Sequence, residues 1–154
     1  MELSIIASGS NGNCCLLCAG GTSVLFDAGM GYAETAKRMA ALGKDIRQLD
    51  GIVLSHAHGD HYRGIGPIAR RLHIPVYVQK EVYASCWRRL GSVDVRHFEE
   101  EFTIGGMEII PVETSHDVTS CGFVVGRLGM FTDTGCVTSM MREAVRELDA
   151  VLLE

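Results

Sequence analysis

The sequence lacks the features that mark secreted and membrane-embedded chains. It opens Met1-Glu2-Leu3-Ser4-Ile5-Ile6, without the basic segment that begins a signal peptide. No apolar run approaches the roughly 20 residues that cross a bilayer. From these two absences we expect a cytoplasmic protein that does not associate with a membrane.

An excess of positive charge is also missing. The chain carries 14 lysines and arginines against 19 aspartates and glutamates, a net charge of −5. This balance excludes a broad basic surface that grips phosphates nonspecifically, although it is compatible with a small basic cleft. With only 3 prolines, no low-complexity tract and 47% hydrophobic residues, the chain has the composition of a folded protein. At 154 residues we expect one domain, residues 1–154.

The cysteines do not suggest a disulfide framework. There are six of them: Cys14, Cys15, Cys18, Cys86, Cys121 and Cys136. In a reducing cytosol we expect free, buried thiols. Cys14, Cys15 and Cys18 lie in an apolar, strand-like run with no second Cys or His pair at zinc-finger spacing, so packing is favoured over metal ligation there.

Short apolar runs of strand length recur along the chain and are interspersed with a few helical stretches. The predicted strands are Leu3–Ala7, Cys14–Cys18, Val24–Phe26, Ile52–Leu54, Val76–Val78, Met107–Val112, Phe123–Val125, Met130–Thr132 and Ala150–Leu153. The predicted helices are Tyr32–Leu42, Pro67–Leu72, Glu81–Leu90 and Ser139–Leu148. Strands dominate first and then mix with helices, which predicts an α/β fold of sheets covered by helices.

Two further patterns bear on the fold. In the turn Ser8–Asn13 the Asn-Gly pair is typical of a hairpin, which we favour over an anion-binding nest of backbone amides. Leu25–Gly29 resembles Met130–Gly135, since each is an apolar strand that delivers an aspartate just before a glycine. Asp50–Ser55 likewise resembles Asp149–Glu154. The repetition points to a fold built from two related halves.

Three of the six histidines lie in one short segment, Ser55-His56-Ala57-His58-Gly59-Asp60-His61, directly after an apolar strand. Alternate side chains of an extended segment point the same way, so His56 and His58 can bind one ion. Gly59 then permits a sharp turn that aims Asp60 and His61 at a second ion. Imidazoles and carboxylates suit zinc or another borderline divalent metal, and two ions about 3.5–4 Å apart can share an activated water.

Further ligands are expected where later strands end. His116 follows the strand Met107–Val112 and would complete a three-histidine set with His56 and His58. Asp133 follows Met130–Thr132 and would bridge both ions. The remaining histidines are assigned to packing (His73) and to the surface (His97).

In order and context these motifs resemble the metallo-β-lactamase fold family. The resemblance rests on His-x-His-x-Asp-His, the earlier Asp27-Ala-Gly, the later His116 and Asp133-Thr-Gly. The opening Ala7–Asn13 and the segment Thr114–Asp117 look most like its YycJ or WalJ subgroup. The resemblance implies an αββα sandwich with two divalent ions between the sheet edges. It also implies that Asp60 binds the second ion and orients the attacking water, and that Asp27 hydrogen-bonds the histidine loop and rigidifies it.

The resemblance further implies one more histidine for the second ion, beyond a strand like Ala150–Leu153. Because the sequence stops at Glu154, we expect the second half of the sandwich to be incomplete, with Asp60, His61 and Asp133 left for that ion. A natural short variant, a truncation and a homo-oligomer that completes the fold are the three explanations.

The hypothesis for function is hydrolysis of phosphodiesters, nuclease-like, on DNA or RNA. Zinc is the default metal, with manganese or iron as alternatives. Hydrolysis of a thioester, lactone or other small ester is the second hypothesis, and a noncatalytic metal-binding or interaction form of the fold is the third. The sequence identifies no substrate-binding residue. Five arginines could line a phosphate path, but arginines on helix faces are more typical of solvated surface. They are Arg63, Arg70, Arg71, Arg88 and Arg89.

Overall fold

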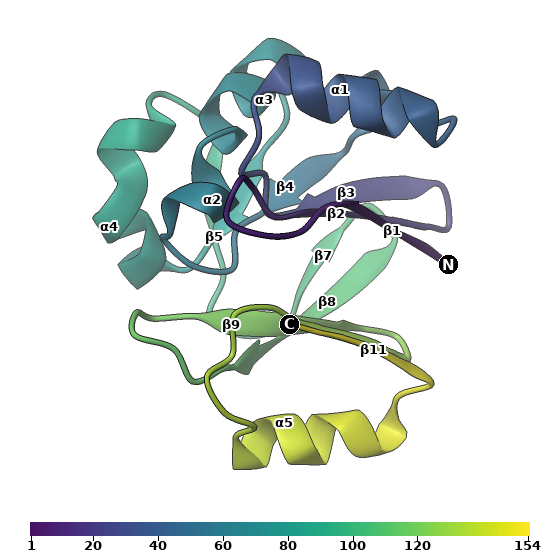
Figure 1. The fold of residues 1–154 in the computed structure, drawn as a ribbon, viewed down its shortest axis with the longest axis vertical. Coiled ribbons are helices and arrows are strands. Elements are labelled where there is room, and N and C mark those ends of the chain that lie inside the picture. Colours follow the sequence, from purple (N-terminus) through teal and green to yellow (C-terminus); the bar gives the residue numbers. More distant parts are fainter.

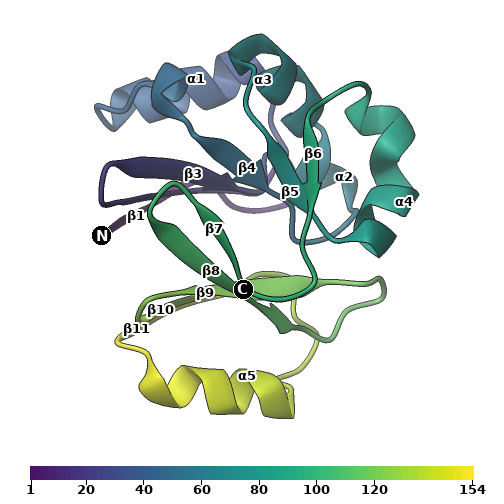
Figure 2. The same cartoon turned by 180° about the vertical axis from the view of Figure 1, so that it is seen from behind.

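Two β-sheets face each other and each carries helices on its outer side in the computed structural model, which describes all of residues 1–154 (Figure 1). The first sheet has the order β1-β2-β3-β4-β5-β6 and the second the order β11-β10-β9-β8-β7. The chain passes from one sheet to the other after β6, where β7 and β8 begin the second sheet (Figure 2). The αββα sandwich expected from the sequence is therefore confirmed.

The strands of the first sheet are β1 (Glu2–Ala7), β2 (Cys14–Ala19), β3 (Thr22–Phe26), β4 (Gly51–Val53), β5 (Val76–Val78) and β6 (Val95–His97). Those of the second are β7 (Phe102–Ile104), β8 (Met107–Glu113), β9 (Cys121–Val125), β10 (Leu128–Phe131) and β11 (Ala150–Leu153). The helices are α1 (Tyr32–Ala41), α2 (Gly59–Tyr62), α3 (Ile65–Leu72), α4 (Lys80–Leu90) and α5 (Ser139–Ala144), with short 3-10 turns at Ile46–Gln48 and Val145–Glu147. None of the helices combines the length and hydropathy that crossing a membrane requires.

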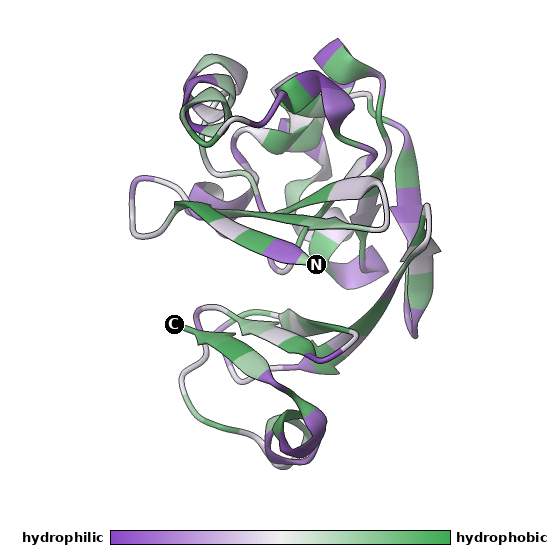
Figure 3. Ribbon diagram, turned by 90° about the vertical axis from the view of Figure 1, so that its right-hand side faces the viewer, coloured by the Kyte–Doolittle hydropathy of each residue, from purple (hydrophilic) through white to green (hydrophobic).

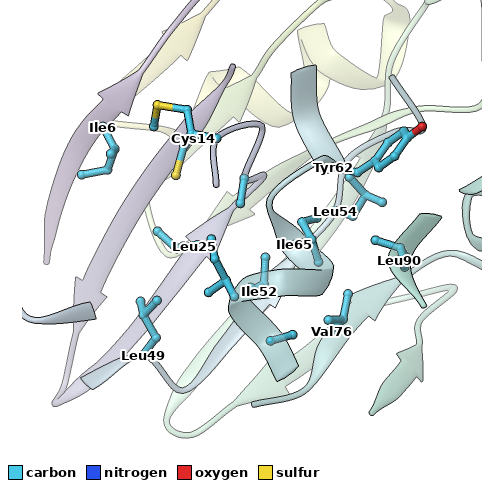
Figure 4. Close-up of a cluster of buried hydrophobic side chains, with 14 of the residues drawn as sticks. Ile6, Cys14, Leu25, Leu49, Ile52, Leu54, Tyr62, Ile65, Val76 and Leu90 are labelled. Carbon is cyan, nitrogen blue, oxygen red and sulfur yellow. The ribbon is translucent and has the colours of Figure 1, made fainter. Parts of the chain in front are cut away.

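Both faces of the central strands are buried, which explains their continuous apolar sequences. Leu25 of β3 packs toward the helices α1, α3 and α4, in a cluster that includes Ile52, Leu54 and Ile65 (Figure 4). Its neighbours Val24 and Phe26 point the other way, into the core between the two sheets. Figure 3 shows hydrophobic residues concentrated in the strands of both sheets. Alternate side chains of β3 therefore face the helices on one side and the second sheet on the other, which places this strand between these two layers.

The repetition seen in the sequence is a repetition of topology. In the first half β2 and β3 pair antiparallel, α1 crosses over, and β4 returns parallel to β3. In the second half β9 and β10 pair antiparallel, α5 crosses over, and β11 returns parallel to β10. Equivalent backbone hydrogen bonds lie just before the returning strands. Asp50 N–H donates to Ser23 O, and Asp149 N–H donates to Arg127 O, each at 2.8 Å.

Several local predictions need correction. The strands β6 and β7 were not predicted, because each is three residues long and carries polar residues such as Arg96 and Thr103, so neither has the apolar run of a buried strand. The helix α2 was not predicted either: Gly59, where a sharp turn was expected, is the first residue of this helix. The last helix ends at Ala144, before the predicted Leu148. His73, assigned to packing, is exposed and ends α3 in the left-handed conformation, φ 56°.

Three loops interlock beneath the histidine segment. Ala28 N–H donates to His61 O, Gly64 N–H donates to Ala28 O, and Asn13 N–H donates to Asp60 O, each at 2.7 Å. Glycine is needed where these backbones meet. A Cβ on Gly64 would stand 1.6 Å from Met30 O, and one on Gly29 would stand 1.7 Å from Asp60 O. The close approach holds the segment that carries the site against the end of β3.

We expect Gly64→Ala to lower the free energy of unfolding by about 2 kcal/mol or more, because the added methyl group overlaps a backbone oxygen that cannot move independently. Chemical denaturation of the two proteins measures the difference. Gly106→Ala is the matched control, since a Cβ there meets nothing within 4 Å. Equal stability of the Gly64→Ala protein and the parent would contradict the interlocked arrangement.

Candidate metal centre

The polar residues singled out in the sequence gather where strands of both sheets end. Asp27 follows β3, the histidine segment follows β4, His116 lies in the β8–β9 loop and Asp133 follows β10. The sheets are joined at this point, because His56 forms a single antiparallel bridge with Ser120 and Cys121 N–H donates to Ser55 O at 3.3 Å. The site therefore draws its side chains from both halves of the sandwich.

Three imidazoles form the first group. One ring nitrogen from each of His56, His58 and His116 lies within 4.8 Å of the others. His116 Nε2 and His58 Nδ1 are 3.1 Å apart. Each pair of rings stands close to perpendicular, with interplanar angles of 81° to 89° and centroids 4.7–4.8 Å apart. Three ring nitrogens converging in this way match the three-histidine ligand sets that bind zinc.

A second group shares His56 with the first. It consists of His56, His61 and Asp133, again with ligand atoms within 4.8 Å of one another. Asp133 Oδ2 is 2.6 Å from His61 Nε2, yet it has no hydrogen-bond partner. Asp133 adopts the left-handed conformation, φ 52°, which few residue types tolerate and Asp does.

Asp27 organises the histidines from below. It is buried, and its carboxylate accepts hydrogen bonds from Ser55 N–H (2.8 Å), from Ser55 Oγ (2.7 Å) and from His61 Nδ1 (2.8 Å). Because the Ser55 hydroxyl donates its one hydrogen to Asp27, it accepts from His56 Nδ1 at 2.9 Å. Both imidazoles are thereby held with Nδ1 protonated, which leaves each Nε2 lone pair for the site.

The residues present fit a divalent cation. His56 is fully buried, and its Nε2 atom has no hydrogen-bond partner. Such a polar atom is costly to bury unless something binds it. Burial, followed by the nearby His61, lowers the pKa of His56 to about 4, so its imidazole is neutral and able to ligate at ordinary pH. His56, which carries this orphaned nitrogen, belongs to both ligand groups.

His61 has the opposite electrostatic character. Burial by itself lowers its pKa, but the hydrogen bond from Nδ1 to Asp27 and the charges of Asp27, Asp133 and Asp60 outweigh burial and raise the pKa. The surroundings of His61 therefore favour a positive charge. A proton or a metal cation near Nε2 supplies one, and a metal that binds there displaces the proton.

Asp60 lies beside the second group but is not one of its three members. Its Oδ2 is 3.7 Å from His61 Nε2 and accepts a hydrogen bond from Asn13 Nδ2 at 3.2 Å. The same amide nitrogen is 2.8 Å from His61 Nε2. Asp133, expected to bridge the two ions, has its ligand atom within reach of those of His56 and His61.

Three residues of the site were given no role by the sequence. Asn13 ends the Ser8–Asn13 turn, which does connect the antiparallel strands β1 and β2 as predicted, and its side chain reaches Asp60 and His61. Ser55 links Asp27 to His56 by hydrogen bonds. Its place in the sequence, a polar residue between a buried strand and the histidine motif, could have indicated a role in the site. Asp117 Oδ1 lies 3.5 Å from His58 Nε2 and 3.3 Å from His116 Nε2.

A cleft of about 750 Å³ opens beside the first group. Its wall is mostly polar and includes His116, the hydroxyls of Ser115 and Thr119, and the side chains of Gln79 and Glu99. Of the site histidines, His116 lines this cleft, together with residues of β8 and of the segment between β5 and α4.

The comparisons with known proteins identify the family of the chain. The model of the beta-lactamase superfamily domain matches residues 22–154. The exodeoxyribonuclease WalJ of Streptococcus pneumoniae is 30% identical over 165 residues, covering 99% of this chain and 61% of that protein. The exodeoxyribonuclease YycJ of Bacillus anthracis is 26% identical over 167 residues, covering 100% of this chain and 62% of its own length. The chain thus spans about three fifths of the length of these curated relatives.

Among solved structures, a diphosphatase from the PhnP family superposes with a TM-score of 0.74 at 22% identity, over 90% of this chain and 58% of that one. This likeness concerns the fold, which implies divalent metal ions in agreement with the His/Asp cluster. From the match of the family model and the WalJ relative, this chain belongs to the beta-lactamase superfamily domain family, and its fold is that of the metallo-β-lactamases.

Proposed function

We propose that the chain is a metal-dependent hydrolase of phosphodiesters with nuclease-like activity. The observation that carries the proposal is the pair of adjacent ligand groups, His56-His58-His116 and His56-His61-Asp133, which share the buried residue His56 with its unpartnered Nε2. Because that nitrogen has one lone pair, His56 serves the first ion, and His61 and Asp133 with the nearby Asp60 remain for a second. When bound, the ions would supply an activated water and neutralise the charge that develops on phosphate oxygens.

The proposed ligands of the first ion are His56, His58 and His116, and those of the second are Asp60, His61 and Asp133. Zinc fits neutral imidazoles and carboxylates, and manganese or iron is the alternative because carboxylates are present. Asp60 is the proposed catalytic residue: its partly exposed carboxylate lies at the rim of the second group, where it can orient a water and accept its proton. Asp27 keeps His56 and His61 in the tautomers that ligation requires.

Substrate chemistry rests on the relatives. The two curated relatives described above are named exodeoxyribonucleases, and the PhnP-family structure is named a diphosphatase. Each of these names describes cleavage at phosphorus, and the exodeoxyribonuclease names support a nucleic acid as the substrate class. Esters, thioesters and lactones are the competing substrates, and a metal-binding form without activity is the competing noncatalytic role.

We expect the purified chain to hold about two equivalents of zinc. Replacing His116 by alanine removes one of the three nitrogens of the first group, so metal content should fall by about one equivalent. Elemental analysis after gel filtration measures both values. His97→Ala, which changes an exposed histidine outside the cluster, should retain the full content. One equivalent or less in the parent chain would overturn the binuclear proposal.

The metal-loaded chain should cleave bis(p-nitrophenyl) phosphate and an end-labelled oligonucleotide, and EDTA should abolish both activities. Because Asp60 is proposed to position and deprotonate the water, Asp60→Asn should reduce kcat by roughly 10²-fold or more. Rates on a panel of thioesters and lactones serve as the comparison. Hydrolysis of that panel without any phosphodiester cleavage would reject the phosphodiesterase proposal in favour of a hydrolase of thioesters, lactones or other small esters.

Asp27→Asn should weaken zinc binding by roughly 10- to 100-fold, since an amide has one acceptor oxygen where the carboxylate accepts three hydrogen bonds. Competition with a chromogenic chelator gives the Kd. Asp149→Asn, which removes an exposed carboxylate paired with Arg127, is the control and should leave the Kd unchanged. Circular dichroism of the metal-free proteins separates a loss of ligand orientation from a loss of fold.

A further inference from the structure

The arginines without ionic partners are concentrated on one side of the molecule. Seven arginines form no ion pair with a carboxylate, and five of these lie in or directly after the helices α2, α3 and α4. They are Arg63, Arg70, Arg71, Arg88 and Arg89, all exposed. The other two, Arg142 and Arg146, lie in and just after α5, on the opposite outer face (Figure 1). A chain with a net charge of −5 thus keeps a locally basic helical layer.

The helix α4 adds an aromatic side chain to this layer. Trp87 is the one tryptophan of the sequence, and 50% of its surface is exposed. The guanidinium of Arg88 lies 5.2 Å from the centre of its ring, so an arginine covers part of the indole while much of the side chain faces solvent. An exposed aromatic ring flanked by arginines is the combination on which unpaired bases stack and phosphates bind.

The helix α4, which carries Trp87, begins beside the cleft of the metal centre. Gln79, which directly precedes α4, lines the same cleft as His116. The helix then runs for 11 residues, about 16 Å, away from that cleft. At its far end Arg70 of α3 donates to Leu90 O, which brings the basic end of α3 against the basic end of α4. Glu81 is the one carboxylate of α4, against Lys80, Arg88 and Arg89.

We propose that the outer surface of α4 binds a single-stranded nucleic-acid flank of a substrate held at the metal centre. One base stacks on Trp87, and neighbouring phosphates bind Arg88 and Arg89. This inference rests on the proposed function, since it takes the substrate to be DNA or RNA. A single strand is specified because a duplex keeps its base faces stacked inside and offers none to Trp87.

The test uses the single tryptophan as its probe. A thymidine oligonucleotide of about 15 residues is added to the metal-free protein in EDTA, so that no cleavage occurs, and Trp fluorescence is recorded. We expect saturable quenching that weakens with added salt, because phosphate contacts release counterions. With a labelled oligonucleotide, Trp87→Ala should bind roughly tenfold more weakly by fluorescence anisotropy. Unchanged Trp fluorescence across the titration would overturn the proposal.

Two double variants separate this surface from net charge alone. Arg88→Gln with Arg89→Gln should lower the slope of log affinity against log salt by about 1.4, at roughly 0.7 for each lost phosphate contact to a single strand. Arg142→Gln with Arg146→Gln removes the same charge from the opposite face and should leave the slope unchanged. If both double variants lowered the slope equally, the proposed binding surface on α4 would be rejected.

The outcome also distinguishes this site from the proposed function. Quenching of Trp87 by an oligonucleotide that the metal-loaded protein never cleaves would leave this surface standing and reject the nuclease activity. Cleavage with the same KM in the parent chain and in the Arg88→Gln, Arg89→Gln protein would retain the activity and reject this surface.

Discussion

The carboxylate of Asp27 is the constraint on which the site depends. It is buried at the end of β3, where a lone charge is unfavourable, and it is stabilised by three donors from the histidine segment. Those donors fix the protonation of His56 and His61, so one buried charge sets the direction in which two imidazole lone pairs point. The same bonds tie β3 to the segment after β4, and the loop glycines allow the backbones to approach closely enough for this.

The two-fold repetition of the fold explains why His61 lies between two aspartates. Asp27 and Asp133 occupy equivalent places after β3 and β10, and both take the left-handed conformation, with φ of 59° and 52°. One contacts Nδ1 of His61 and the other lies beside its Nε2. Two related halves that face each other therefore bring two carboxylates to one imidazole, and the negative potential that results raises the pKa of His61 and favours a cation at the site.

The net negative charge of the chain conceals a group of arginines in or directly after the helices α2, α3 and α4. Acidic residues dominate the chain, yet the helical layer beside the metal centre carries five arginines that no carboxylate neutralises. Phosphate binding depends on such local potential and not on the sum of charges. The packing of α3 against α4 brings Arg70 to the end of α4 that carries Arg88 and Arg89, while Gln79, just before the other end of this helix, lines the cleft together with His116.

The residues that gather at the site can be read from the sequence, because polar residues follow apolar strands at Asp27, His56, His116 and Asp133. Asp27 and His56 follow neighbouring parallel strands of the first sheet, and His116 and Asp133 follow strands of the second, so each pair meets at one edge of its own sheet. The packing of the two sheets then brings the edges together and divides the residues into groups. It gave His56 to both ligand groups, brought Asn13 from a hairpin turn to His61 and inserted Ser55 between Asp27 and His56. Such contacts join residues 28 to 48 positions apart or depend on side-chain hydrogen bonds, which the packing of two sheets sets and local sequence patterns do not encode.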